Sequence, residues 1–83
     1  MVTGSSTGIG YAMATGLGEA GAKVALNYAN NRPRAEAALA KYRDAGWEGA
    51  LFRANVIEPA DVERLVSDVG RSLGPIDILI INA

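Results

Sequence analysis

The chain has 83 residues, of which 49% are hydrophobic and 20% charged, so it can form at most one small globular domain. Its formal net charge of -1 provides no basic surface for nucleic acid or an anionic membrane, and we expect neither as a partner. The sequence has no cysteine and no histidine, which excludes a disulfide framework, a thiol nucleophile and the two usual zinc ligands.

Apolar runs in the sequence are short. The longest, Ile78 to Ile81, is far below the roughly 20 residues that a membrane-spanning helix requires. No charged-then-apolar leader precedes it. We therefore predict a cytoplasmic protein without a targeting or membrane-spanning segment.

The first quarter of the chain predicts a strand, a glycine-rich turn and a helix. Residues 1–3 are apolar and β-branched and form a very short strand, which runs directly into the turn. The helix extends over residues 8–20, and Gly21 ends it. Gly16 and Gly18 are expected to let this helix pack closely on a sheet. Its predicted buried face comprises Ile9, Met13, Leu17 and Ala20.

The middle of the chain repeats this order. Residues 24–28 predict a second strand, and residues 29–34 predict the turn after it. Pro33 suits the first turn of a second helix, which Gly46 ends. Residues 49–56 form a third predicted strand. The apolar face of the second helix comprises Ala35, Ala38, Leu39 and Tyr42.

The last third of the chain predicts one more helix and one more strand. Pro59 begins the helix, and Gly74 and Pro75 end it. Residues 77–83 are almost continuously apolar, which is typical of a strand covered on both faces of a parallel sheet. The clearest amphipathic stripe of the chain lies in this third helix, at Val62, Leu65, Val66, Val69 and Leu73.

The predicted order is thus β-α-β-α-β-α-β, which indicates an α/β fold. Right-handed crossovers would give an incomplete, doubly wound parallel sheet of the Rossmann type, with the strands in the order 3-2-1-4. A crevice is expected beyond the carboxyl ends of strands one and four, where the order reverses. We predict that residues 1–83 are the N-terminal part of one dinucleotide-binding domain.

The glycine-rich turn after the first strand is the first candidate site. Gly4 permits a sharp turn, Gly8 lets a phosphate approach the backbone, and Gly10 allows the helix to pack closely on the sheet. The N–H groups near Ile9 and the positive end of the helix dipole would receive a pyrophosphate. A Walker-type loop is excluded because no lysine precedes Lys23. An ordinary tight strand-to-helix turn remains the alternative.

Four stretches of the sequence resemble one enzyme family. They are TGSSTGIG, GAKVALNY, ANV and IDILIINA, and their spacing is similar to that in the short-chain dehydrogenase/reductase family. The resemblance is to NADPH-using members, such as 3-oxoacyl-[acyl-carrier-protein] reductases or glucose dehydrogenase-like enzymes. It implies an NAD(P)-dependent oxidoreductase that transfers hydride between the nicotinamide cofactor and a small carbonyl or alcohol substrate. It also implies a homo-oligomer, a dimer or tetramer, at full length.

The resemblance implies a set of cofactor-binding residues. Asn55 stands where the family usually has the aspartate that contacts adenine, and Val56 follows it; the alternative for Asn55 is a cap at the strand end. Asn82 and Ala83 match the middle of the family's NNAG, with Ile81 in place of the first asparagine. The loop residues that match the family's phosphate and ribose site are Gly4, Ser5, Ser6, Thr7, Gly8, Ile9 and Gly10, among which Ser6 can equally serve as a turn residue.

The end of the second predicted strand bears on the choice between NAD and NADP. NAD-using members usually carry an acidic residue there, which repels a 2′-phosphate. This chain has no acid at that place, and its sequence resembles that of NADPH-using members. Arg32 or Arg34 could bind the extra phosphate, or both could be solvated at a helix start. We predict NADP, with NAD as the alternative, and a pocket formed by Tyr28, Ala29, Asn30, Asn31 and Arg32.

The family's catalytic residues have no match in this sequence. The family's catalytic tyrosine is followed four residues later by a lysine, which lowers its pKa. Tyr11, Tyr28 and Tyr42 are followed at that spacing by threonine, arginine and glycine. We predict no catalytic residue here and no activity of this chain alone. The alternative function is a noncatalytic nucleotide-binding or oligomerisation module.

Overall fold

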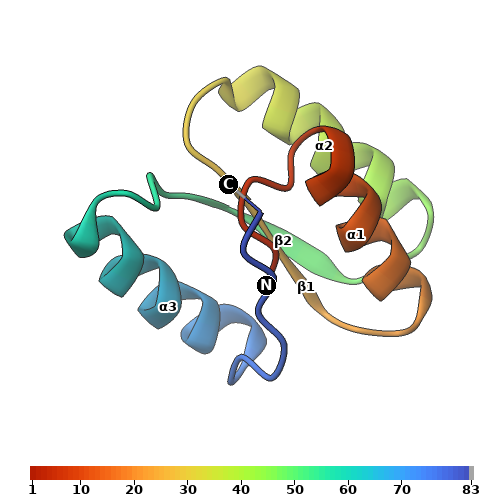
Figure 1. Cartoon of the computed structure of the whole chain (residues 1–83). Coiled ribbons are helices and arrows are strands. Elements are labelled where there is room, and N and C mark those ends of the chain that lie inside the picture. Colours follow the sequence, from red (N-terminus) through yellow and green to blue (C-terminus); the bar gives the residue numbers. More distant parts are fainter. Residues whose placement is uncertain (83) are drawn as a thin grey trace.

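Two parallel strands flanked by three helices form the centre of the structure, a computed structural model that describes residues 1–82 (Figure 1). Helices α1 and α2 lie on one side of the strands and α3 lies on the other. Among the described residues, no helix combines the length and the apolar character needed to cross a bilayer. In chain order the elements are α1 (Gly8–Glu19), β1 (Val24–Tyr28), α2 (Arg32–Asp44), β2 (Gly49–Arg53) and α3 (Pro59–Leu73).

The strands β1 and β2 pair in parallel over five residues each. Val24 lies opposite Gly49 and Tyr28 lies opposite Arg53. Every residue of β1 is buried, which explains its nearly continuous apolar sequence. The predicted third strand is shorter than expected, because the pairing ends at Arg53 and the chain turns at residues 56–57.

The terminal segments do not form the two further strands that we predicted. Val2 makes an isolated parallel bridge to Leu26 and another to Ile80, and neither segment continues as a ladder. Of residues 1–3 only Val2 forms a bridge, and the described part of residues 77–83 has a partner on one side only. The expectation that this segment is covered on both faces is also wrong, since Ile81 is 76% exposed. The bridged segments nevertheless follow the order β2, β1, Val2, Ile80.

Buried side chains gather in two clusters, one on each face of the strands. Along β1, Val24 and Leu26 face α1 and α2, whereas Ala25 faces α3, because side chains of a strand alternate between its faces. The first cluster comprises Val2, Ala14, Val24, Leu26 and Tyr42, and the second comprises Ala25, Ala54, Leu65 and Val69.

Helices α2 and α3 bury most of the faces that their sequences predict. Ala35, Ala38 and Tyr42 of α2 are buried, and Leu39 is half-buried. In α3 the stripe is confirmed at its centre, whereas its member Val66 is 48% exposed.

Helix α1 uses a different face from the predicted one. Ile9 is 70% exposed, and the buried positions are Gly10, Ala14 and Gly18. Small residues allow α1 to approach its neighbours closely. A Cβ at Gly18 would lie 2.6 Å from the Tyr42 hydroxyl oxygen, so Gly18 packs on α2 rather than on the sheet. Gly16 faces open space, and its predicted packing role is wrong.

Two matched substitutions test this packing. We expect Gly18→Ala to lower the free energy of unfolding by about 1–3 kcal/mol, because the Tyr42 ring has no room to move away. Gly16→Ala should raise it by about 0.5–1 kcal/mol, since alanine has the higher helix propensity and meets no neighbour there. Urea denaturation of the two variants measures both changes. Equal effects at the two positions would contradict the described contact.

Candidate functional site

The glycine-rich turn, residues 3–10, lies where the first bridged segment meets α1. Gly4 has φ 60° and Gly8 has φ 58°, so both adopt the left-handed conformation that glycine tolerates best. Thr7 is extended and precedes the first residue of α1. The sharp turn predicted at Gly4 is therefore confirmed as a backbone conformation, whereas the approach of a phosphate to Gly8 stays a prediction.

A buried asparagine holds this turn in place. The Gly4 N–H donates to Asn27 Oδ1 at 3.0 Å, and the Ser5 N–H donates to the Asn27 carbonyl oxygen at 2.9 Å. The Asn27 N–H in turn donates to Ser5 Oγ at 2.8 Å, and this hydroxyl donates to the Val2 carbonyl oxygen at 2.7 Å. The Ser5 hydroxyl is thus buried among protein groups, and its contact with a cofactor stays a prediction.

Asn27 also reaches the neighbouring strand. Its Nδ2 donates to the carbonyl oxygens of Phe52 and Ala54, both at 3.3 Å, and its side chain is 2% exposed. One amide group therefore connects the glycine-rich turn with the carboxyl ends of β1 and β2. Asn27 is not among the predicted site residues, although a polar residue inside an apolar strand was the available signal.

The N-terminus of α1 is suited to an anion. The first N–H groups of a helix have no partner within it, and Thr7 makes no side-chain cap here. The first turn of α1 contains no acidic residue that would occupy or repel a ligand. Gly8 and Ile9 are exposed, and a Cβ at Gly8 would meet nothing within 4 Å. Backbone donors and open space thus coincide at this helix end.

The segment near Asn82 covers the other side of the turn. The Asn82 N–H donates to Thr3 Oγ1 at 2.9 Å, and its Nδ2 donates to the Gly4 carbonyl oxygen at 3.2 Å. A Cβ at Gly10 would lie 2.4 Å from that carbonyl oxygen and 2.6 Å from Asn82 Nδ2. Gly10 therefore permits close packing, as predicted, but against the turn and Asn82. The predicted site residue Ala83 lies outside the described residues.

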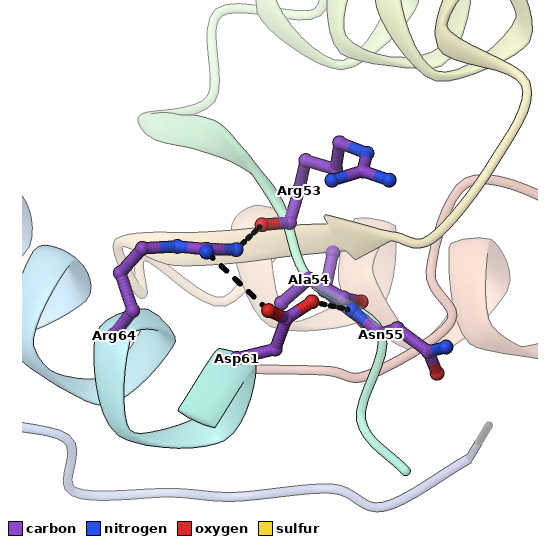
Figure 2. A network of polar contacts seen from close by, with 6 residues as sticks. Arg53, Ala54, Asn55, Asp61 and Arg64 are labelled. Carbon is purple, nitrogen blue, oxygen red and sulfur yellow. Dashed lines mark hydrogen bonds and ion pairs between the residues drawn. The ribbon is translucent and has the colours of Figure 1, made fainter. Parts of the chain in front are cut away.

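The chain turns sharply after β2, around Asn55 (Figure 2). The Asn55 N–H donates to Asp61 Oδ2 at 2.9 Å, and its carbonyl oxygen accepts from the Glu58 N–H at 3.0 Å. Asn55 Oδ1 accepts from the Ile57 N–H at 3.3 Å, which is the local capping that the sequence analysis left open. Val56 is half-buried and packs on the second cluster of buried side chains, on the α3 side of the strands.

Asp61 is charged at neutral pH. The hydrogen bond from the Asn55 N–H is the main cause that lowers the pKa of its carboxyl group; partial burial opposes this, and Arg64 and Arg53 add to the lowering. Arg64 Nη1 lies 3.3 Å from Asp61 Oδ1. Asp61 is not among the predicted site residues.

The end of β1 contains the residues predicted to select the cofactor. Tyr28 is 7% exposed, so its ring belongs to the core, while Ala29 is half-buried and Asn30 is exposed. Asn31 has φ 40° and caps α2, with its Oδ1 accepting from the Arg34 N–H at 3.1 Å.

The two candidate arginines have different surroundings. Arg32 Nε lies 2.7 Å from Glu36 Oε1, so its charge has a partner on α2. Arg34 lines a shallow groove that also contains Ser6 and Lys41. The structure thus brings Arg34, rather than Arg32, next to the glycine-rich turn. Among residues 1–82 there is no cluster of acidic side chains that could hold a metal ion.

The sequence is similar to known proteins along its whole length. Residues 1–83 match the family described as short chain dehydrogenase. The chain is 41% identical to a 2-dehydro-3-deoxy-D-gluconate 5-dehydrogenase of Formosa agariphila and 37% identical to a 3-oxoacyl-[acyl-carrier-protein] reductase of Staphylococcus epidermidis. Both matches include 100% of this chain, but only 31% and 34% of the relatives. The chain therefore spans about a third of their length.

A solved structure is similar in fold as well as in sequence. The actinorhodin polyketide ketoreductase, in a variant solved with NADPH, superposes with a TM-score of 0.93 and 34% identity. The match covers 99% of this chain and 31% of the ketoreductase. Its fold therefore contains the arrangement of helices and strands that this chain adopts.

Replacing the buried amide tests its structural role. We expect Asn27→Leu to lower the free energy of unfolding by about 2–4 kcal/mol, because it leaves the Gly4 N–H and two carbonyl oxygens without their partner. Asn30→Ala, on an exposed residue nearby, should change it by less than about 0.5 kcal/mol. Urea denaturation measures stability, and amide exchange at Gly4 reports on the turn itself. Unchanged exchange at Gly4 in Asn27→Leu would contradict this role.

Proposed function

Because this chain belongs to the short-chain dehydrogenase family, we propose that it is the cofactor-binding part of an NADP-dependent oxidoreductase. The reaction is hydride transfer between the nicotinamide ring and a carbonyl or alcohol substrate, in a homo-oligomeric enzyme. The observation that carries the proposal is the N-terminus of α1, where exposed backbone donors face open space without an acidic residue. These are the conditions under which a pyrophosphate binds to a helix end.

We propose that a dinucleotide would contact the described residues at three points. The N–H groups around Gly8 and Ile9 would hold the pyrophosphate. Asn55 and Val56, after β2, would frame the adenine. Asn82, which already contacts the glycine-rich turn, would border the nicotinamide half. The hydrogen bonds of Asn27 place the glycine-rich turn beside the end of β2, so the first two points belong to one edge of the sheet.

The charge around the end of β1 favours NADP over NAD. No acidic residue occupies positions 28–32, so nothing there repels a 2′-phosphate. Arg34 and Lys41 share a groove with Ser6 and provide positive charge beside the turn. Arg32 would contribute less, because Glu36 already neutralises it. Arg34 and Lys41 would attract the exposed 2′-phosphate through solvent, so their contribution to NADP affinity should fall as ionic strength rises.

The role of this chain in the reaction is to bind and orient. When bound, the nicotinamide supplies or accepts the hydride. The chain's own groups fix the position of the cofactor through backbone donors, which need no reorganisation as charge moves. We assign no catalytic acid or base to residues of this chain, since no tyrosine in it precedes a lysine by four positions.

The pyrophosphate assignment is tested at Gly8. In the full-length protein, Gly8→Val places a branched side chain in the space proposed for the phosphates, and we expect the Kd for NADP to rise more than about tenfold. Gly21→Val is the matched control, because Gly21 also has a positive φ and open surroundings but lies beyond the opposite end of α1. It should weaken folding without changing the Kd. Calorimetric titration measures both, and a folded Gly8→Val protein of unchanged affinity would refute the assignment.

The cofactor preference is tested at Ala29, because Tyr28 is too buried to accept a carboxylate. Ala29→Asp places a negative charge near the proposed 2′-phosphate, and we expect the preference for NADP over NAD to fall by about two orders of magnitude, or roughly 2.7 kcal/mol. Ala29→Asn has nearly the same size without the charge and should change the preference much less. The ratio of the Kd values for NAD and NADP is the measurement. An unaltered protein that prefers NAD would contradict the proposal.

A further inference from the structure

The carboxyl end of β2 is held from α3 by a pair of side chains (Figure 2). Asp61 uses both carboxylate oxygens: Oδ2 accepts from the Asn55 N–H at 2.9 Å, and Oδ1 lies 3.3 Å from Arg64 Nη1. The Arg64 guanidinium also donates from Nη2 to the Arg53 carbonyl oxygen at 3.2 Å. Two backbone groups on either side of Ala54 are therefore bound by one ion pair, which we call the Asp61–Arg64 clamp.

Ala54, which lies between these two backbone groups, is held from the opposite side by β1. The Ala54 N–H donates to the Tyr28 carbonyl oxygen at 2.9 Å, and the Ala54 carbonyl oxygen accepts from Asn27 Nδ2 at 3.3 Å. Ala54 is 1% exposed. With contacts from β1 and from α3, the backbone of residues 53–55 has little freedom. The direction in which the chain leaves the sheet at Asn55 is thus set from two sides.

The clamp differs from ordinary ion pairing on a helix surface. Asp68 and Arg71 of the same helix are also an aspartate and an arginine three residues apart, and they pair with each other. Within residues 1–82, the hydrogen bond of Asp68 goes to Arg71 and none connects its side chain to the segment after β2. Asp61, in the first turn of α3, bonds instead to a backbone N–H outside the helix. Asp68 is therefore a matched control for the helix and for the pairing.

We propose that Asp61 and Arg64 are positioning residues that set the affinity for the adenine half of the cofactor through the backbone of Asn55. This inference rests on the proposed function, in which Asn55 and Val56 frame the adenine. Neither clamp residue needs to touch the ligand. The low pKa of Asp61 supports the assignment, because the carboxylate then stays charged and holds the N–H at neutral pH.

The test separates the two halves of the cofactor. The full-length protein and its variants are titrated with NADP, with ADP-ribose and with nicotinamide mononucleotide. For Asp61→Ala we expect the Kd values for NADP and ADP-ribose to rise about five- to tenfold, because the freed backbone loses the adenine-binding geometry. The Kd for nicotinamide mononucleotide should stay the same. Asp61→Asn keeps an oxygen acceptor for the Asn55 N–H and should recover most of the lost affinity.

The controls decide between positioning and general stabilisation. Asp68→Ala should leave all three Kd values unchanged, and amide exchange at Asn55 should be faster in Asp61→Ala only. Equal loss for all three ligands, or an equal effect of Asp68→Ala, would overturn the inference, as would normal ADP-ribose binding by Asp61→Ala. Absence of any nucleotide binding by the unaltered protein would overturn the proposed function and, with it, this inference.

Discussion

A single buried amide, the side chain of Asn27, joins the parts of the molecule on which the candidate site depends. It accepts from the glycine-rich turn and donates to two carbonyl groups at the end of β2. An amide is suited to this position because it has both a donor and an acceptor, and each is satisfied without a net charge in the core. An apolar residue would remove the acceptor of the Gly4 N–H and a donor from two carbonyl groups, and an aspartate would bring those two carbonyl oxygens against a carboxylate. The turn, β1 and β2 therefore keep one fixed arrangement.

The hydrogen-bonded backbone and the exposed charges lie in separate places around Asn27. The turn and residues 53–55 are held by short hydrogen bonds, most of them to the main chain. The cationic groups, such as Arg34 and Lys41, lie on exposed parts of α2. Recognition by backbone donors depends on geometry, whereas recognition by exposed cations depends on screening by salt. Groups common to all dinucleotides would then be bound by the rigid part, and the choice between two cofactors would depend on the exposed one.

Local sequence patterns predicted the helices and both strands, but not how far the sheet extends. The α3 stripe and the glycines at positions 4 and 8 determine their local structure through neighbours a few residues away. The strand expected at residues 77–83 required partners on both sides, and the described residues provide only one. The roles of Asn27 and Asp61 could not be predicted, because they depend on hydrogen-bond partners that lie close only in the folded chain. The cofactor residues stay predictions, since sequence periodicity identifies buried faces and not ligands.

The contacts that complete the glycine-rich turn join residues up to 79 positions apart, because Asn82 binds to Thr3 and Gly4. A chain that leaves the ribosome N-terminus first has synthesised this turn long before the segment that covers it. Closing so long a loop carries an entropic cost that local contacts within α1 do not share. The N-terminus of α1 can thus form early, whereas the segment at Asn82 can pack against Gly10 only after residue 82 has been made. The glycine-rich turn consequently reaches the environment that it has in this structure only after a segment almost 80 residues later has been made.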